Sequence, residues 1–337
     1  MLQKEGKGFI LSAMRFSPRF LRFLLWSCVL VVAAYGLGRL YYRLTGGFTL
    51  SNITYNLPYD PRWDSLPLSE EEKAQLRQIL DQKFTYLGKG CQSYVFKSED
   101  DRYVIKFFKY QRFRPQAWLD YVTFIPGMSA YRQDKIEKKR NKLEGVFTSW
   151  KIAYEKLRSE TGVLFIHLNK TGNLHQNVRL ADKMGFEHIL NLDDYEFMLQ
   201  KKANLLCPTL ENLASAGKMG EAQALIDRLL QLIVSEYRRG YADNDHALMQ
   251  NTGVFDQQPI HIDVGQFVHN RKIQNNLVAH QELFNKTWKF QRWLNKEIPQ
   301  LGIHLKARLQ EIIGPDYAQL KPRLRKGGVA ALSHISD

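Results

Sequence analysis

The feature that most constrains this chain is an uncharged apolar stretch near its N-terminus. The stretch covers 16 residues, 23–38, and is bounded by Arg22 and Arg39. A helix needs roughly 20 apolar residues to cross a bilayer core, and residues 40–42 supply the remainder if the Arg39 side chain reaches the interface. Trp26 and the tyrosines at the other end suit the aromatic belts of a membrane. The sequence therefore predicts a single transmembrane helix over residues 23–42.

Two other interpretations of the stretch stay open. A cleaved secretory signal has the same basic start, and the small residues around Tyr35 could suit a signal peptidase. A buried core helix is disfavoured by the flanking arginines. Five basic residues precede the stretch and two follow it. The positive-inside rule then places the N-terminus in the cytoplasm and the main domain on the opposite side of the membrane.

Composition narrows the class of protein. The 337 residues are 44% hydrophobic, which excludes a collagenous or largely disordered chain. Three cysteines without a CxxC pair exclude a disulfide framework and a cysteine-based zinc site. Residues 1–43 carry seven Lys or Arg and one acidic residue, and this segment supplies a large part of the net charge of +14 of the whole chain. The basic excess is thus concentrated at the expected anchor, and we expect no nucleic-acid partner.

The rest of the chain suggests an α+β arrangement in which strands come first and helices later. Ser69 and Glu72 form a capping-box pattern at the start of a helix. Short apolar or alternating runs predict strands over 84–87, 94–97, 103–108, 163–168 and 195–199. Helical spacing of apolar residues predicts helices over 134–157, 220–237, 275–301 and 303–313. The predicted parts are a basic segment 1–22, the helix 23–42, an irregular tether 43–68, a small lobe 69–203, a helical lobe 204–313 and a basic tail 314–337.

Two clusters carry the chemistry. Gly88 and Gly90 lie between two expected strands, where backbone amides can approach a phosphate, and Lys106 ends a Val-Ile-Lys run on the next strand. The plain alternative for the glycines is a hairpin turn. Far downstream, the strand Ile260–Ile262 delivers Asp263 to its end, where a carboxylate can bind Mg²⁺.

The second cluster also contains polar residues before that strand. Asn251 could supply a further oxygen ligand for a metal, and Asp245 or Asp243 could orient an acceptor hydroxyl. Taken one at a time, these residues also suit ordinary turns and a strand exit. Their order along the chain is what makes them a candidate site.

In this order, the motifs resemble those of the protein-kinase-like superfamily, over roughly residues 80–300. Gly88 and Gly90 match its Gly-rich loop, Ser93 stands at the third glycine, and Val95 matches the valine that follows. Lys106 matches the strand lysine. The resemblance implies a bilobal fold, with a small β-rich lobe and a larger helical lobe, that uses ATP and Mg²⁺.

The resemblance also assigns the downstream residues. Asn251 matches the catalytic-loop asparagine, and Asp263 with Gly265 matches the metal-binding Asp-Phe-Gly triplet. The helix partner of Lys106 would be Glu155, with Glu144 as the alternative. Residues 199–202 fall where the family places its hinge to the adenine.

The chain departs from the family at the catalytic loop. No His-Arg-Asp triplet precedes Asn251, and Asp245 lies six residues before it, where the family has five. No Ala-Pro-Glu follows Asp263. These departures favour an atypical kinase or a pseudokinase over a regulated protein kinase.

Three hypotheses follow. The first is a membrane-anchored phosphotransferase that uses Mg-ATP on an unknown acceptor, with Asp245, Lys106 and Glu155 as catalytic residues. The second is a membrane-tethered pseudokinase that binds a protein or lipid partner. The third is an α+β membrane protein without kinase relationship.

Two basic segments have plain interpretations. The basic and aromatic residues 107–115 indicate a strand edge, or a lipid-binding surface if they are functional. Residues 135–142 indicate a solvated helix face.

Overall fold

The computed structural model describes residues 17–323. Its contacts divide the chain into two units, and the boundary along the chain lies between Gly47 and Phe48. Parts of two predicted segments lie outside the described residues. These parts are residues 1–16 of the basic N-terminal segment and residues 324–337 of the basic tail.

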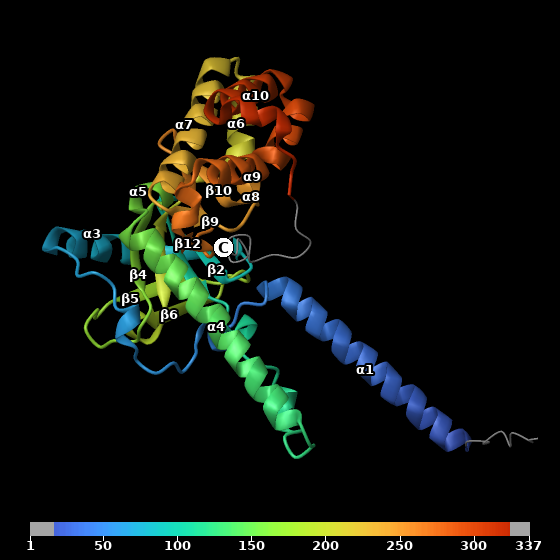
Figure 1. The fold of residues 1–337 in the computed structure, drawn as a ribbon. Coiled ribbons are helices and arrows are strands. Elements are labelled where there is room, and N and C mark those ends of the chain that lie inside the picture. The colour runs from blue at the N-terminus through green and yellow to red at the C-terminus, as the bar shows by residue number, and fades with distance from the viewer. Residues whose placement is uncertain (1–16, 324–337) are drawn as a thin grey trace, which may run out of the picture. The chain divides into compact units, whose positions relative to one another are not determined.

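The first unit contains one long helix, α1 (Pro18–Thr45), drawn in blue (Figure 1). The Ser17 hydroxyl accepts a hydrogen bond from the Phe20 amide (3.2 Å), and the helix ends at Gly46 with φ 66°, a left-handed conformation that suits glycine. The helix contains the predicted span 23–42 and is long and apolar enough to cross a membrane. A signal sequence meets the same criterion, and the orientation stays a prediction.

The second unit contains a seven-stranded sheet in the order β4-β7-β3-β2-β1-β5-β6. All neighbours are antiparallel except β1 and β5, which are parallel. Five strands overlap the predicted runs: β1 (Lys83–Lys89), β2 (Ser93–Ser98), β3 (Tyr103–Phe108), β4 (Val163–His167) and β7 (Phe197–Lys201). The sequence analysis missed β5 (Asn177–Ala181) and β6 (Glu187–Asn191), which are short, partly exposed and polar.

The sheet has a hydrophobic core on each face, and β3 contributes to both. Ile105 and Phe107 pack with α3 (Glu70–Leu80), while Phe108 packs with α4 (Met128–Glu155) on the opposite face. Alternation along a strand therefore turns Lys106 to the same side as Phe108. The position of Lys106 follows directly from this alternation.

The segment expected to be an irregular tether contributes to the core. Residues 48–68 include α2 (Leu50–Ile53) and the 3₁₀ turn η1 (Pro61–Trp63), and both Phe48 and Ile53 are buried against the sheet. The helix expected after Ser69 is α3, and its capping box is present. The apolar side chains of residues 48 and 53 thus join the sheet core just after the first unit ends.

The helical part of the second unit lies at one end of it, in yellow to red (Figure 1). It is built from α6 (Leu206–Ser215), α7 (Met219–Arg238), α8 (Leu248–Asn251), α9 (Asn276–Glu297) and α10 (Pro299–Ile313). The break between α9 and α10 falls at Pro299 because proline has no amide hydrogen to continue a helix. Small sheets join β8 (Asn204–Leu205), β10 (Thr252–Phe255) and β11 (Gln258–His261), and β9 (Tyr241–Asp243) with β12 (Phe267–His269).

Candidate functional site

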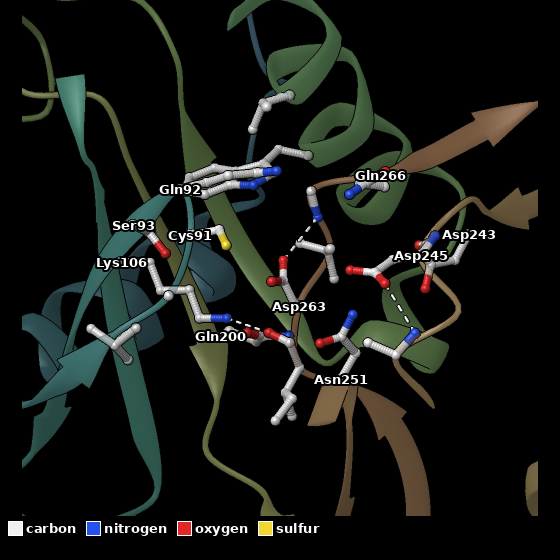
Figure 2. Close-up of a pocket in the computed structure, with 18 of the residues that line it drawn as sticks. Cys91, Gln92, Ser93, Lys106, Gln200, Asp243, Asp245, Asn251, Asp263 and Gln266 are labelled. Carbon is white, nitrogen blue, oxygen red and sulfur yellow. Dashed lines mark hydrogen bonds between the residues drawn. The ribbon is translucent and has the colours of Figure 1, made fainter. Parts of the chain in front are cut away.

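A cavity of about 970 Å³ lies between the seven-stranded sheet and the helical part of the second unit. Its walls come from the β1–β2 hairpin, β3, the middle of α4, the segment after β7, and the loops around α8 and after β11. Figure 2 shows how these elements bring distant side chains together. Of the predicted site residues, all but Glu155 line this cavity: Gly88, Gly90, Ser93, Val95, Lys106, Asp245, Asn251 and Asp263.

The β1–β2 hairpin forms one wall. The Gly90 amide donates a hydrogen bond to the Ser93 carbonyl (2.9 Å), which closes the turn. A Cβ atom added to Gly88 or Gly90 would meet nothing within 4 Å. Neither glycine has a positive φ, so the turn itself does not require glycine. At these two positions the hairpin carries no side chain, which leaves room there for a bulky ligand beside the backbone.

Lys106 enters the cavity from β3 and is 8% exposed. Its ammonium group donates a hydrogen bond to the Ile262 carbonyl. Burial lowers the pKa of Lys106 from 10.5 to about 8, and the carboxylate of Asp263 partly offsets this effect. Lys106 is therefore a buried cation whose main electrostatic neighbour is Asp263.

Asp263 follows β11, at the strand end that the sequence predicts. Its Oδ1 accepts a hydrogen bond from the Gly265 amide (3.2 Å). Burial raises the pKa of the Asp263 carboxyl group, while the charge of Lys106 and the Gly265 hydrogen bond act against that rise. Lys106 and this one amide therefore compensate the buried negative charge of Asp263 only in part, and a bound cation would stabilise the charged form of the carboxylate.

Asn251 lies beside Asp263 because the Ile262 amide donates a hydrogen bond to the Asn251 carbonyl (2.8 Å). The side-chain amide of Asn251 is buried, and its Nδ2 has no hydrogen-bond partner. Within residues 17–323, no three His, Cys, Asp or Glu side chains gather as metal ligands. A carboxylate with one carboxamide fits Mg²⁺, which keeps several non-protein ligands such as water and phosphate oxygens.

Asp243 and Asp245, which the sequence analysis left as alternatives, both line the cavity and differ in their partners. Asp243 is buried and forms an ion pair with Lys286 (Nζ to Oδ2, 3.0 Å). Asp245 lines the cavity, and its Oδ1 accepts a hydrogen bond from the Ala247 amide (2.9 Å). Figure 2 shows the Asp245 carboxylate between Asp243 and Asp263. Asp245 is thus the aspartate whose carboxylate is not committed to a buried ion pair.

Neither candidate glutamate is the partner of Lys106, and this corrects the assignment of Glu155 with Glu144 as its alternative. The Glu155 carboxylate lies 3.6 Å from Lys151, and Glu144 pairs with Arg140 at 2.9 Å. Ser149 of α4 makes hydrogen bonds to the loop after Asp263 instead. Its hydroxyl donates to the Val264 carbonyl (2.5 Å) and accepts from the Phe267 amide (2.6 Å).

Two glutamines, neither of which the sequence analysis assigned a role of its own, lie in the cavity wall. Gln200, in the segment likened to a hinge, donates to the carbonyls of Thr161 (2.6 Å) and His261 (2.8 Å). Gln92 reaches from the β1–β2 hairpin to Gly265, where an added Cβ would lie 2.0 Å from Gln92 Oε1. The Oε1 atoms of both glutamines are buried without partners. Acceptors of this kind can receive a hydrogen bond from a ligand.

Two cations to which the sequence analysis gave no site role also line the cavity. Arg112 and Lys142 both contribute to its wall, and no salt bridge within the described part of the chain involves either of them. Burial lowers the pKa of Lys142, and the neighbouring charges of Arg112 and Lys139 lower it further. Sequence reasoning treated residues 135–142 as a solvated face because helical spacing alone does not show which turn meets a cavity.

Comparison with known proteins gives only distant similarities. No protein-family model matches the chain, and no curated protein matches its sequence. The bifunctional kinase-methyltransferase WbdD is 16% identical with a TM-score of 0.32, and its 2.2 Å structure gives 17% and 0.33. These matches cover 70% of this chain and less than half of WbdD, 45% and 46%. Rv3197 from Mycobacterium tuberculosis, solved with erythromycin, is 11% identical with a TM-score of 0.30, and 87% of this chain and 94% of that one are covered. Similarities this distant do not assign a family, so the interpretation below rests on the cavity.

Proposed function

We propose that the protein is a membrane-anchored, kinase-like phosphotransferase whose cavity binds a nucleoside triphosphate together with Mg²⁺. The observation that carries this proposal is the meeting of Lys106, Asp245, Asn251 and Asp263 beside an open glycine hairpin. These residues come from β3, from the loops around α8 and from the end of β11. A buried lysine opposite a buried carboxylate in a large cavity is a typical arrangement for a phosphate site.

The phosphates would lie against the cationic side of the cavity. The hairpin at Gly88 and Gly90 would allow a close approach of backbone, and Lys106 would offset phosphate charge from β3. Arg112 and Lys142 add two further positive charges to the wall.

The acidic side of the cavity would hold the metal and the acceptor. Asp263 and Asn251 would bind Mg²⁺, which supplies charge neutralisation on the phosphates. Asp245 would accept the proton of the acceptor hydroxyl. The hydroxyl oxygen would then bond to the γ-phosphorus while the nucleoside diphosphate leaves. The Ala247 amide, which donates to Asp245 Oδ1, fixes the direction of that carboxylate.

One observation favours a second function, nucleotide binding without transfer. Lys106 donates to the Ile262 carbonyl, and no glutamate among residues 17–323 pairs with it. In active protein kinases an ion pair to a helix glutamate positions the strand lysine. A pseudokinase that binds nucleotide as a structural ligand, and a protein or lipid as its partner, would not need that pair.

The first experiment tests binding with the full chain in detergent micelles. We expect Mg-ATP at 100 times its dissociation constant to stabilise the fold by about 2.7 kcal/mol. Lys106→Met and Asp263→Asn should lose the shift. Lys97→Met on β2, whose lysine pairs with exposed Asp101, should keep it. If all four folded proteins show no shift with Mg-ATP, both nucleotide functions are excluded.

The second experiment separates transfer from binding. Release or transfer of the γ-phosphate is followed in the wild type and in Asp245→Asn. A phosphotransferase predicts at least about a 100-fold loss of turnover with nucleotide affinity retained, because only the proton acceptor changes. Binding without any turnover in the wild type, tested with membrane lipid and protein fractions as acceptors, would assign the binding function instead.

A further inference from the structure

A projecting arm, residues 114–142, carries almost no core contacts along its length. It consists of the loop before α4 and the first half of α4, and Figure 1 shows this half of the helix extending from the rest of the second unit. Leu143 is the first buried residue of α4. The preceding 15 residues of the helix therefore extend for about 22 Å without a packed face.

The loop of the arm exposes large apolar side chains. Tyr121 is 79% exposed and Phe124 is 82% exposed, and Trp118 and Ile125 of the loop and Tyr131 at the start of α4 are each exposed by more than 40%. The loop is not unstructured. Leu119 is buried, and Asp120 forms an ion pair with Arg132 of α4 at 2.7 Å. A structured loop that presents tryptophan, tyrosine and phenylalanine to solvent is typical of an interaction surface.

The charge of the arm selects the kind of surface it fits. The arm contains seven Lys or Arg and three Asp or Glu. Aromatic side chains beside a basic helix are the composition of segments that lie in the interface of anionic membranes. A protein groove would instead require one apolar stripe along the helix, and the exposed half of α4 is polar on all sides apart from a few positions.

The base of the arm lies close to the point where the chain leaves the anchor. Only Gly46 and Gly47 separate α1 from Phe48, which is buried in the second unit. Arg114, at the base of the arm, donates to the Ser51 carbonyl of α2 (2.9 Å). Three extended residues span about 11 Å, so a bilayer crossed by α1 would be within that reach of Phe48.

We propose that the arm docks on the bilayer: the side chains of residues 118–125 insert into an anionic lipid interface while the basic half of α4 lies along the headgroups. This docking does not rest on the proposed nucleotide site, because residues 118–140 of the arm do not line the cavity. It gives the second unit a fixed orientation toward the membrane that a two-residue link alone does not provide.

The test uses the full chain in nanodiscs of phosphatidylcholine with about 30% phosphatidylserine. Cys28, Cys91 and Cys207 are replaced by serine, and an environment-sensitive fluorophore is attached at Phe124→Cys. The matched control is Ile303→Cys on α10, an apolar position that is 71% exposed. Brominated lipids should quench the label at position 124 and should leave the label at 303 unchanged. Tyr121→Cys repeats the test at a second exposed site.

The charge contribution is tested with Lys135→Glu combined with Lys138→Glu. This double variant should reduce quenching at position 124 in the anionic nanodiscs and leave it unchanged in phosphatidylcholine alone. Equal quenching in both lipids for the wild-type arm would overturn the role of charge. Labels at 121 and 124 that are as unquenched as the label at 303 would overturn docking itself. Docking would also be overturned if these labels were shielded from solvent in detergent, where a second copy of the chain and not a bilayer would cover them.

Discussion

Among single residues, the buried pair Lys106 and Asp263 gives the site its electrostatic character. Burial lowers the pKa of the lysine to about 8 and raises that of the carboxyl group, so each charge is costly where it lies. Buried charges are retained where a ligand needs them, because an apolar pair of similar volume is often no less stable. The pair is therefore better explained by binding than by folding stability.

The lowered pKa of Lys106 predicts a pH dependence of stability. Between pH 8 and 10.5 the unfolded chain binds a proton at this lysine that the folded chain has released, so the free energy of unfolding rises with pH in this window. The contribution is roughly 3 kcal/mol. We expect the stability of the wild type relative to Lys106→Met to increase by about that amount from pH 7.5 to 10.5, measured by denaturant unfolding in detergent. A pH-independent difference would contradict the shift.

Asp243 and Asp245 differ in how much their substitution should change stability, because only Asp243 is held in a buried ion pair. Lys286→Met leaves the Asp243 carboxylate buried without its partner and should cost about 3–5 kcal/mol in unfolding free energy. Adding Asp243→Asn to that variant should recover part of the loss, because no buried charge remains. Asp245→Asn serves as the control and should change stability little. Additive losses in the double variant would mean that the ion pair contributes nothing.

Among the elements, the β1–β2 hairpin allows binding to be separated from folding. Gly90→Ala places a methyl group where nothing lies within 4 Å and where φ is not positive. Stability without ligand should change by less than about 1 kcal/mol. If phosphates lie against the hairpin, nucleotide affinity should fall at least about tenfold, measured by calorimetry. Unchanged affinity would place the phosphates elsewhere.

The capping box of α3 gives a prediction about folding alone. The Ser69 hydroxyl accepts a hydrogen bond from the Glu72 amide (3.2 Å), and Glu72 accepts one from the Ser69 amide (3.0 Å). Ser69→Ala should cost about 1 kcal/mol in unfolding free energy. Ser129→Ala, in the exposed first turn of α4, is the control and should have no measurable effect. Equal unfolding midpoints for the two variants would show that the cap does not stabilise the helix.

At the scale of the whole molecule, α1 is long and apolar enough to cross a membrane, and if it does so its orientation sets the side on which the second unit lies. The positive-inside rule predicts that this unit lies opposite the cytoplasm. In a variant with Cys28→Ser and Cys207→Ser, exposed Cys91 reports the side. A membrane-impermeant maleimide should label it in right-side-out vesicles and not in inverted ones. The reverse pattern would place the second unit in the cytoplasm, where ATP is available, and would strengthen the phosphotransferase proposal.

The sequence by itself determined the features that depend on local pattern. Apolar length specified α1, the Ser69–Glu72 pair specified the start of α3, and alternation specified β3 with Lys106 on it. β6 at the sheet edge and its neighbour β5 were missed because strands of five residues with only two or three apolar side chains gain their stability from neighbouring strands rather than from a long apolar run of their own.

Only the tertiary structure decided which charged residues share the cavity. Helical spacing placed Glu155 and Glu144 on α4, but the packing of α4 directs Ser149 to the loop after Asp263 and Lys142 to the cavity. Lys286 is 43 residues from Asp243, and no local pattern connects them. Charge partners depend on which faces of distant elements pack together. In this chain, local patterns therefore specify the helices and strands, and long-range packing specifies the residues of the site.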